Sequence, residues 1–501
     1  MASKAKAKKT IAPANPTQVP RLAIRMYRHG LGDCLLLRFA RPAGKGIFNV
    51  LIDCGLIMVA QKAKETMTAV AEDIKKTCKR LDVVVMTHEH WDHASGFSSQ
   101  QARDVFAKIE VGEVWYSWTE DPRNPLGTRL RKERAEKVSA LAMAATALAG
   151  IATTPLAVSR AESLASILGF FGMDINAAKT AGGPAVAIGK TRDAFEYLMK
   201  KPSVKTRYCY PEKAPLALGD VENVRVFVLG PPQDESMIKK STPSRAGREV
   251  YELAAEASFA NNLSPAFSRL RSDRGSAVDT DDCPFDALLR RRPEDASKTD
   301  SDLARLVNAV WNPPAMSWRK IEFDWTQVAE TLALNLDTHT NNTCLVLAFE
   351  FVDTGEVFLF PADAQVGNWL SWQDRKWDLR STTGISKVSG PDLLARTVFY
   401  KVGHHGSHNA TLRSLGLEQM TSEDLVAFIP VFKEQAVKNR WMGMPFPPLI
   451  DRLKEKTGGR LLRSDENAPG KSELTSLTPK AREVFLSAVT MNELYFEYSV
   501  G

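Results

Sequence analysis

Six of the eight histidines in this 501-residue chain fall into two short segments, His88–His93 and His404–His408. The first segment reads His-Glu-His-Trp-Asp-His, and the second reads His-His-Gly-Ser-His. Imidazole and carboxylate groups are ligands that suit Zn²⁺, Mn²⁺ or Fe²⁺. Scattered core histidines would not concentrate in this way, so the two segments indicate a metal site.

The spacing within the first segment allows two ions to be bound. Residues i and i+2 of an extended segment project to the same side, so His88 and His90 can bind one ion together. Asp92 and His93 follow a bend and can serve a second ion. Two divalent ions about 3.5–4 Å apart, bridged by a carboxylate and a hydroxide, generate a nucleophile at neutral pH.

Each group of candidate ligands follows a hydrophobic run that is typical of a buried strand. Residues 81–86 form a continuous run that ends just before His88. Residues 357–360 lead into Asp363, and residues 397–402 lead into His404. Polar loops at strand ends, with helices between the strands, predict a layered α/β protein.

The motifs and their order are similar to those of a known family. His88–His93 has the HxHxDH pattern of the metallo-β-lactamase fold, and Lys401–Ser407 resembles the KVxHHGS pattern of the ComEC-type competence protein hydrolase domain. Further segments resemble the same branch in the same order, namely Gly30–Leu37, Leu51–Gly55, Phe227–Pro232, Asn341–Leu347, Phe358–Asp363 and Arg460–Asp465. The resemblance implies a four-layer αββα metallo-β-lactamase sandwich with two large, partly helical insertions.

The resemblance also implies which residues hold the metal. Two divalent ions, Zn²⁺ or Mn²⁺, would be bound by six residues: His88 and His90 at the first ion, Asp92, His93 and His405 at the second, and Asp363 as the bridge.

The candidate catalytic residues implied by the same resemblance are Asp92, His404 and His408. His404 would face the substrate, either as a phosphate contact or as a proton donor to the leaving group. His408 is either a substrate contact or a group that supports the ligands.

The sequence departs from the family pattern at two points near these ligands. Residues 341–344 read Asn-Asn-Thr-Cys where many family members have another histidine, which leaves the first ion short of protein ligands. His339 is either the replacement ligand or a surface or loop histidine. Pro361-Ala-Asp363 replaces the usual Thr-Gly-Asp, so the loop lacks its glycine while the aspartate is kept.

Several other polar residues receive structural interpretations. We expect Asp33 and Asp53 to hold turns through backbone hydrogen bonds, because aspartate favours such local bonding. Four residues form either an anion site or a packed or solvated face: Arg440, Trp441, Arg460 and Arg463.

Composition defines the rest of the chain only broadly. With 25% charged and 44% hydrophobic residues, the chain is of the ordinary globular type, which excludes a wholly disordered, collagen-like or disulfide-scaffold protein. Four lysines and no acid in residues 1–20 account for most of the net charge of +7 and predict a basic disordered tail. Residues 21–501 are expected to form one hydrolase domain with insertions at about 120–200 and 233–335.

No membrane segment is expected. Ser139–Val158 has no charged residue, but it consists mainly of Ala and Thr and contains Gly150 and Pro155. We therefore predict a buried or partner-facing helix there, because a spanning helix needs about 20 predominantly apolar residues. The lysine-rich start is not followed by an apolar segment, and the six cysteines form no CxxC pair, so a cytoplasmic location is expected.

The combined prediction is a metal-dependent hydrolase, foremost a dinuclear phosphodiesterase or nuclease that uses a metal-bound hydroxide. The ComEC-type resemblance implies DNA or another phosphodiester as substrate. One alternative is a hydrolase of a small phosphoester, cyclic nucleotide or lactone. Another is an effector module controlled by a protein partner or by homo-oligomerisation through the insertions. An insertion that covers the site would favour a small ligand, and an open basic groove would favour a polymer.

Overall fold

The computed structural model describes residues 19–501 except 59, 61, 152–154, 175–189, 241–300, 311–324, 382–383, 410, 440 and 442. Nearly all of the predicted N-terminal tail, parts of both predicted insertions, and Arg440 therefore lie outside the described residues.

The first of two large sheets has eight strands in the order β16-β17-β1-β2-β3-β4-β5-β6. Strands β3 to β6 pair in parallel, whereas β16, β17, β1, β2 and β3 pair antiparallel. The bounds are β1 Leu22–Tyr27, β2 Leu35–Ala40, β3 Ile47–Ile52, β4 Arg80–Met86, β5 Glu110–Ser117, β6 Lys205–Cys209, β16 Val489–Met491 and β17 Tyr495–Val500.

The second sheet has seven strands in the order β15-β14-β13-β10-β9-β8-β7. Strands β10, β13, β14 and β15 pair in parallel, and the others pair antiparallel. The bounds are β7 Leu216–Leu218, β8 Val221–Gly230, β9 Val346–Phe351, β10 Val357–Phe360, β13 Thr397–Lys401, β14 Val426–Ile429 and β15 Leu461–Arg463. A small hairpin joins β11 Lys376–Ser381 and β12 Gly384–Ser389.

The two sheets pack face to face over a shared apolar core. Because successive side chains of a strand point to opposite faces, Phe358 and Phe360 of β10 enter this core, while Val357 and Leu359 face the helices outside it. The ring of Phe39 in the first sheet lies 5.5 Å, centroid to centroid, from that of Phe349 in the second.

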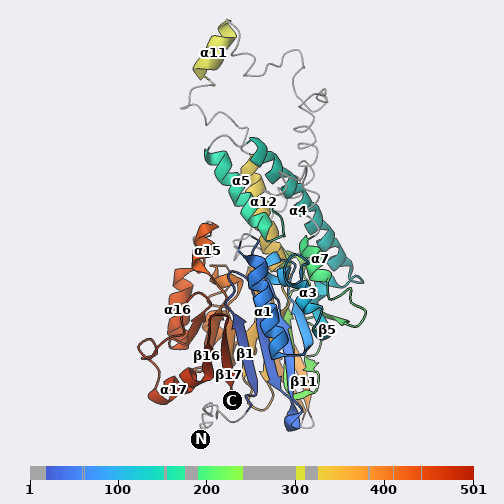
Figure 1. Ribbon diagram of the computed structural model, residues 1–501, viewed down its shortest axis with the longest axis vertical. Coiled ribbons are helices and arrows are strands. Elements are labelled where there is room, and N and C mark those ends of the chain that lie inside the picture. Colours follow the sequence, from blue (N-terminus) through green and yellow to red (C-terminus); the bar gives the residue numbers. More distant parts are fainter. Residues whose placement is uncertain are drawn as a thin grey trace.

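Helices cover the outer face of each sheet, which completes the four αββα layers expected from the sequence (Figure 1). The first sheet is covered by α1 Ala63–Thr77, α3 Arg103–Phe106 and α7 Lys190–Glu196. The second is covered by α13 Val366–Ser371, α14 Gly390–Ala395, α15 Lys433–Lys438 and α16 Pro447–Thr457. The same apolar cluster continues into α4 Pro125–Ile151, α5 Pro155–Gly169 and α12 Trp325–Asn341. The remaining helices are α2 Trp91–Ala94, α8 Glu235–Ile238, α11 Asp302–Val310 and α17 Pro479–Ala488, with short 3₁₀ turns η1 Pro42–Gly44, η2 Ser95–Phe97, η3 Trp118–Glu120, η9 His404–Gly406 and η10 Leu417–Gln419.

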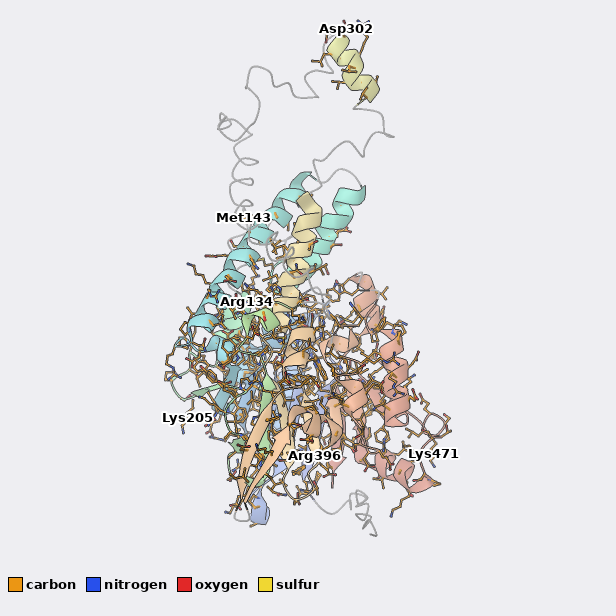
Figure 2. The ribbon with its side chains drawn as sticks, turned by 180° about the vertical axis from the view of Figure 1, so that it is seen from behind. Arg134, Met143, Lys205, Asp302, Arg396 and Lys471 are labelled. Atoms are coloured by element: carbon orange, nitrogen blue, oxygen red, sulfur yellow. The ribbon has the colours of Figure 1, made fainter. Side chains whose placement is uncertain are left out.

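Three helices from the predicted insertions, α4, α5 and α12, contact one another and project side by side beyond one end of the sheets (Figure 1). Figure 2 shows Arg134 on the lower part of α4 and Met143 farther along the same helix. The uncharged segment Ser139–Val158 is divided between α4 and α5, and the residues of α4 within it that face inward are buried. In the part of the chain that the structure describes, no helix combines the length and the apolar character needed to cross a membrane.

Candidate metal centre

The two histidine segments and Asp363 meet at one end of the sandwich, because each follows the carboxyl end of a strand. His88–His93 follows β4, Asp363 follows β10 and His404 follows β13. All six predicted metal ligands are buried. The structure therefore brings together residues that lie more than 300 positions apart in the sequence.

One group of atoms converges around Asp363. His93 Nε2 lies 3.1 Å from Asp363 Oδ2, and His405 Nε2 lies 2.9 Å from Asp92 Oδ2. One ligand atom from each of four residues, Asp33, His93, Asp363 and His405, lies within 4.8 Å of the others. This geometry suits one divalent ion held by nitrogen and oxygen ligands.

The second group is the pair His88 and His90. His88 Nε2 lies 3.0 Å from His90 Nδ1, so the two rings face each other as the i, i+2 spacing predicts. The rings of His88 and His93 lie 4.2 Å apart, which places this pair directly beside the first group.

The outward ring nitrogens of three histidines are fixed by hydrogen-bonding groups. His93 Nδ1 lies 2.8 Å from Asp53 Oδ2, and His405 Nδ1 lies 2.6 Å from the carbonyl oxygen of Pro430. His88 Nδ1 lies 3.1 Å from the hydroxyl of Thr87. Such contacts are typical of histidine ligands, because they fix the ring and turn its other nitrogen toward the ion.

The centre contains buried polar atoms that have no hydrogen-bond partner in the described protein. They are Asp33 Oδ1, His90 Nε2, Asp92 Oδ1, His93 Nε2 and Asp337 Oδ1. Buried polar atoms are nearly always satisfied, so their concentration at one place requires an explanation. Nitrogen and carboxylate oxygen atoms that converge without partners are the donor set that divalent transition metals prefer, so these residues fit a metal site.

Opposite charges stabilise the acidic half of the centre. Burial alone would raise the pKa of the Asp363 carboxyl, but His93 and Lys401 hold that pKa well below its usual range. Burial would likewise lower the pKa of His93, yet Asp363 and Asp92 raise it well above its usual value. Burial lowers the pKa of His90 to about 3, so its ring is neutral.

The loop that carries Asp363 forms without the usual glycine. Ala362 adopts the left-handed conformation with φ of 52°, which costs an ordinary residue about 1–2 kcal/mol. The backbone N–H of His404 compensates in part by donating to Asp363 Oδ1 over 3.0 Å. The aspartate is therefore held in place from the neighbouring strand.

The predicted catalytic residues His404 and His408 both line a cavity beside the centre. Nδ1 of the His404 ring lies 3.2 Å from the amide nitrogen of Gln365 and 2.8 Å from the hydroxyl of Ser407. The side-chain amide nitrogen of Asn409 donates to Gln365 Oε1, which orients the Gln365 amide so that its NH₂ faces His404. His408 is exposed at the same cavity.

Asp53 and Asp33 behave differently from each other. Asp53 accepts hydrogen bonds from the backbone N–H and the hydroxyl of Thr87, as expected of a residue that holds a turn. For Asp33 the expectation of side-chain bonds to the backbone is wrong: its carboxylate pairs with Lys401 and belongs to the group of four residues that could hold a metal ion. Lys401 Nζ also lies 3.4 Å from Asp363 Oδ1, and although burial opposes its charge, the two aspartates raise the pKa of Lys401.

Asp337 is a residue of the centre that the sequence interpretation missed. It lies on α12, with Oδ1 3.8 Å from His90 Nε2 and Oδ2 3.2 Å from Asn341 Nδ2. Burial raises its pKa to about 8, and the charges of Asp92 and Asp363 add to this effect. No local pattern marks this residue, because its position depends on how α12 packs.

His339, the candidate replacement ligand, lines a different cavity, which it shares with residues of α4 and α8. Burial and the nearby charges of Lys137 and Lys239 lower its pKa to about 3. Asp337, and not His339, is thus the α12 residue that faces the histidines of the centre.

Helices of the first predicted insertion hold the loop of candidate metal ligands through ion pairs. Glu89, between the first two histidines, pairs with Arg134 of α4 at 2.5 Å and with Arg192 of α7 at 2.8 Å. Both arginines also pair with buried Glu120. Burial would raise the pKa of Glu120, but Arg192 and Arg134 lower it to about 2.

Two of the arginines considered as an anion site, Arg460 and Arg463, are engaged with neighbouring groups of the fold. Arg460 donates to the carbonyl oxygen of Thr457 at 2.8 Å, and Arg463 pairs with Asp465 at 3.0 Å. Trp441 stacks on Phe170, with ring centroids 4.8 Å apart.

Comparison with known proteins agrees with the fold. A family model described as "Beta-lactamase superfamily domain" matches residues 48–171. This range runs from β3 to the end of α5 and contains Asp53 and His88–His93. No curated protein and no solved structure matches the chain. The match supports a metallo-β-lactamase-type sandwich and, in general terms, a hydrolase.

Proposed function

We propose that the protein is a metal-dependent hydrolase with a centre for two divalent ions, Zn²⁺ or Mn²⁺. The observation that carries this proposal is the convergence of unpartnered histidine nitrogen and carboxylate oxygen atoms. The histidine rings of His93 and His405 are held in place by hydrogen-bonding groups at their other ring nitrogen. The superfamily match over residues 48–171 supports a hydrolase independently of these contacts.

The six predicted ligands would divide between the ions as the contacts suggest. His88 and His90 face each other at one position, and Asp92, His93 and His405 converge at the other. Asp363, which lies 3.1 Å from His93 Nε2, would bridge the two ions. Two bound divalent ions would supply a nucleophile at neutral pH and stabilise negative charge on the substrate.

Asp337 would support the position that lacks a third histidine. Its carboxyl group faces His90 Nε2 across 3.8 Å, and both facing atoms are unpartnered. Divalent ions bound beside it would lower its pKa and favour the carboxylate form. A carboxylate behind a ligating histidine orients the ring and increases its basicity. Asp337 would in this way hold His90 with Nδ1 directed at the ion.

His404 would act on the substrate as a hydrogen-bond donor. We assign the Gln365 amide as the donor to Nδ1 of His404, which would place the ring proton on Nε2. Burial lowers the pKa of His404, which keeps the ring neutral. The Nε2–H group can then donate a hydrogen bond to the oxygen of the bond being cleaved.

The test is metal content and turnover together. Protein purified without chelator should contain close to two equivalents of metal, and Asp363→Ala and His93→Ala should lose both metal and hydrolysis. His339→Gln is the matched control, because it changes a histidine outside the centre and should keep its metal. Wild-type protein that binds no stoichiometric Zn²⁺ or Mn²⁺ would refute the proposal.

A nuclease or phosphodiesterase of the ComEC type is the more specific version of this function, and it is supported by the order of motifs from Gly30 to Asp465. Cleavage of single-stranded, double-stranded or circular DNA in the presence of Mn²⁺ would support it. The cavity beside the centre argues for another substrate class.

A further inference from the structure

A cavity of about 240 Å³ opens beside the metal centre. His404 and Asp337 line it on the side of the centre, so a group bound there lies next to the reacting position. The volume is below the range of about 300–1,000 Å³ that is typical of sites for drug-sized ligands. The cavity therefore fits a small substituent.

Apolar side chains make one wall of this cavity. Phe170 from the end of α5 and Trp441 from the segment after α15 stack with their ring planes 18° apart. Ile167, Leu334 and Met444 complete this wall. Burial of an aliphatic or aromatic group against such a wall is favourable by about 25 cal/mol per Å².

The apolar wall is fixed to the metal-binding loop. The carbonyl oxygen of Phe170 accepts a hydrogen bond from the backbone N–H of Trp91 over 2.6 Å. The Phe170 ring lies 5.6 Å from the ring of His90. The wall therefore has a set position relative to the ligands, which allows it to select the shape of a substrate.

Lysine and arginine are absent from the cavity lining in the part of the chain that the structure describes, and Asp337 is its acidic member. Nucleic acids are bound mainly by Lys and Arg groups that neutralise phosphates. The arginines that lie closest to the first histidine segment, Arg134 and Arg192, are already paired with Glu89 and Glu120. Apart from the ions themselves, the described lining of this cavity would offer a polyanion no lysine or arginine.

We propose that the centre hydrolyses a small uncharged ester, open-chain or lactone, whose aliphatic or aromatic group occupies the cavity against Phe170 and Trp441. This inference rests on the proposed hydrolase function. Water adds across the ester: the bond between the acyl carbon and the ester oxygen breaks, a new C–O bond forms to the water oxygen, and the leaving oxygen receives a proton. His404 Nε2–H donates to the ester oxygen while the apolar group is held by the wall.

The test compares three substrate classes with the metal-loaded protein: p-nitrophenyl esters with acyl chains of increasing length, bis(p-nitrophenyl) phosphate, and single- and double-stranded oligonucleotides. We expect turnover of the esters, with KM falling as the chain grows to fill the cavity, and no cleavage of oligonucleotides. In Trp441→Ala the KM for the longer ester should rise about 10-fold or more, and by a larger factor than the KM for the acetyl ester. Trp441→Phe should restore most of this chain-length preference.

The outcomes separate this inference from the hydrolase proposal. Protein without bound metal would defeat the hydrolase proposal itself. Metal-loaded protein that cleaves oligonucleotides or the phosphodiester but no ester would overturn only the substrate class, and so would metal-loaded protein that turns over none of the three. Equal effects of Trp441→Ala on short and long esters would show that the wall does not bind the acyl group.

Discussion

At the scale of single residues, the centre depends on groups that hydrogen-bond the histidine ring nitrogens facing away from the proposed ions. Asp53 receives three donors: the backbone N–H and hydroxyl of Thr87 and Nδ1–H of His93. An ionised carboxylate has two oxygens that only accept hydrogen bonds, so it can satisfy all three donors. This arrangement fixes the ring of His93 so that Nε2 points at Asp363.

Asp53→Asn should therefore lower metal affinity without removing a ligand. An asparagine amide has one acceptor oxygen, so its NH₂ must face one of the donors and the His93 ring loses its support. Loss of such a contact typically lowers metal affinity about 10–100-fold, which can be measured by competition with a chromophoric chelator. Asp82→Asn is the control, since Asp82 is also buried and accepts a backbone N–H, at 2.9 Å from Asn49, but belongs to an ion pair with Arg41. An equal effect in both variants would contradict this role.

His339 predicts a pH dependence of stability. Burial and the charges of Lys137 and Lys239 lower its pKa to about 3, whereas an unfolded histidine titrates near 6.5. Between these values the unfolded chain binds more protons, so this contribution to the free energy of unfolding is complete above about pH 6.5 and is lost as the pH falls. Because the side chain is only partly buried, we expect a loss of about 1 kcal/mol between pH 7.5 and 5.

The measurement is urea unfolding of wild type and His339→Gln at both pH values in the presence of chelator. Contributions from metal and from the other residues are common to both proteins, so they cancel in the comparison. The variant should lose less stability than the wild type on acidification. Parallel losses would show that His339 is not held in its neutral form.

At the scale of elements, two insertion helices hold the metal-binding loop through the buried pairs of Glu89 and Glu120. Arg192→Met should leave these carboxylates with Arg134 as their only arginine partner and cost about 2–3 kcal/mol, less than a fully buried pair because Arg192 is partly exposed. The free energy of unfolding from urea titration checks this value. Arg305→Met, which breaks the exposed pair with Asp302, is the control and should change stability by less than about 0.5 kcal/mol. A similar loss in the free energy of unfolding in both variants would contradict a structural role of the ion pairs that Arg192 makes with Glu89 and Glu120.

Elements whose signal is local were predicted well from the sequence. The hydrophobic runs expected at 81–86, 357–360 and 397–402 are β4, β10 and β13, and the polar residues that follow them meet at one end of the sheets. A buried strand and the motif that follows it are contiguous in sequence, so a short stretch of the chain is enough to predict both. The order of such runs predicted a layered α/β protein, and the resemblance to the metallo-β-lactamase fold implied the αββα layers.

Features that depend on packing between distant elements were not predictable in this way. Asp337 faces His90 only because α12 packs against α4 and α5, and no residue near Asp337 signals that contact. Phe170 and Trp441 stack on each other although 271 positions separate them in the sequence, so the apolar wall of the cavity could not be predicted from the sequence either. The pairing of Asp33 with Lys401 joins a turn to a strand of the other sheet.

At the scale of the whole molecule, the net charge of +7 says little about the site. The clustered arginines near the metal loop are paired with glutamates, and the cavity lining described here has no Lys or Arg. Four of the chain's lysines lie within residues 1–18, which contain no acid. Any long-range attraction for polyanions should therefore come mainly from this segment and not from the centre.

Deletion of residues 1–18 tests this separation of charge from catalysis. The deletion should leave metal content unchanged and ester turnover within about two-fold, because the candidate metal ligands and the described cavity lining are residues outside 1–18. Weak association with DNA at low salt should decrease, since each lost phosphate contact reduces the salt dependence by about one counterion. Substitution of the four lysines by glutamine in the full-length chain is the matched control and should reproduce the loss of DNA association. A large loss of ester turnover in either protein would show that the N-terminal segment contributes to the site. Unchanged association with DNA would show that residues 19–501 carry the attraction for nucleic acid.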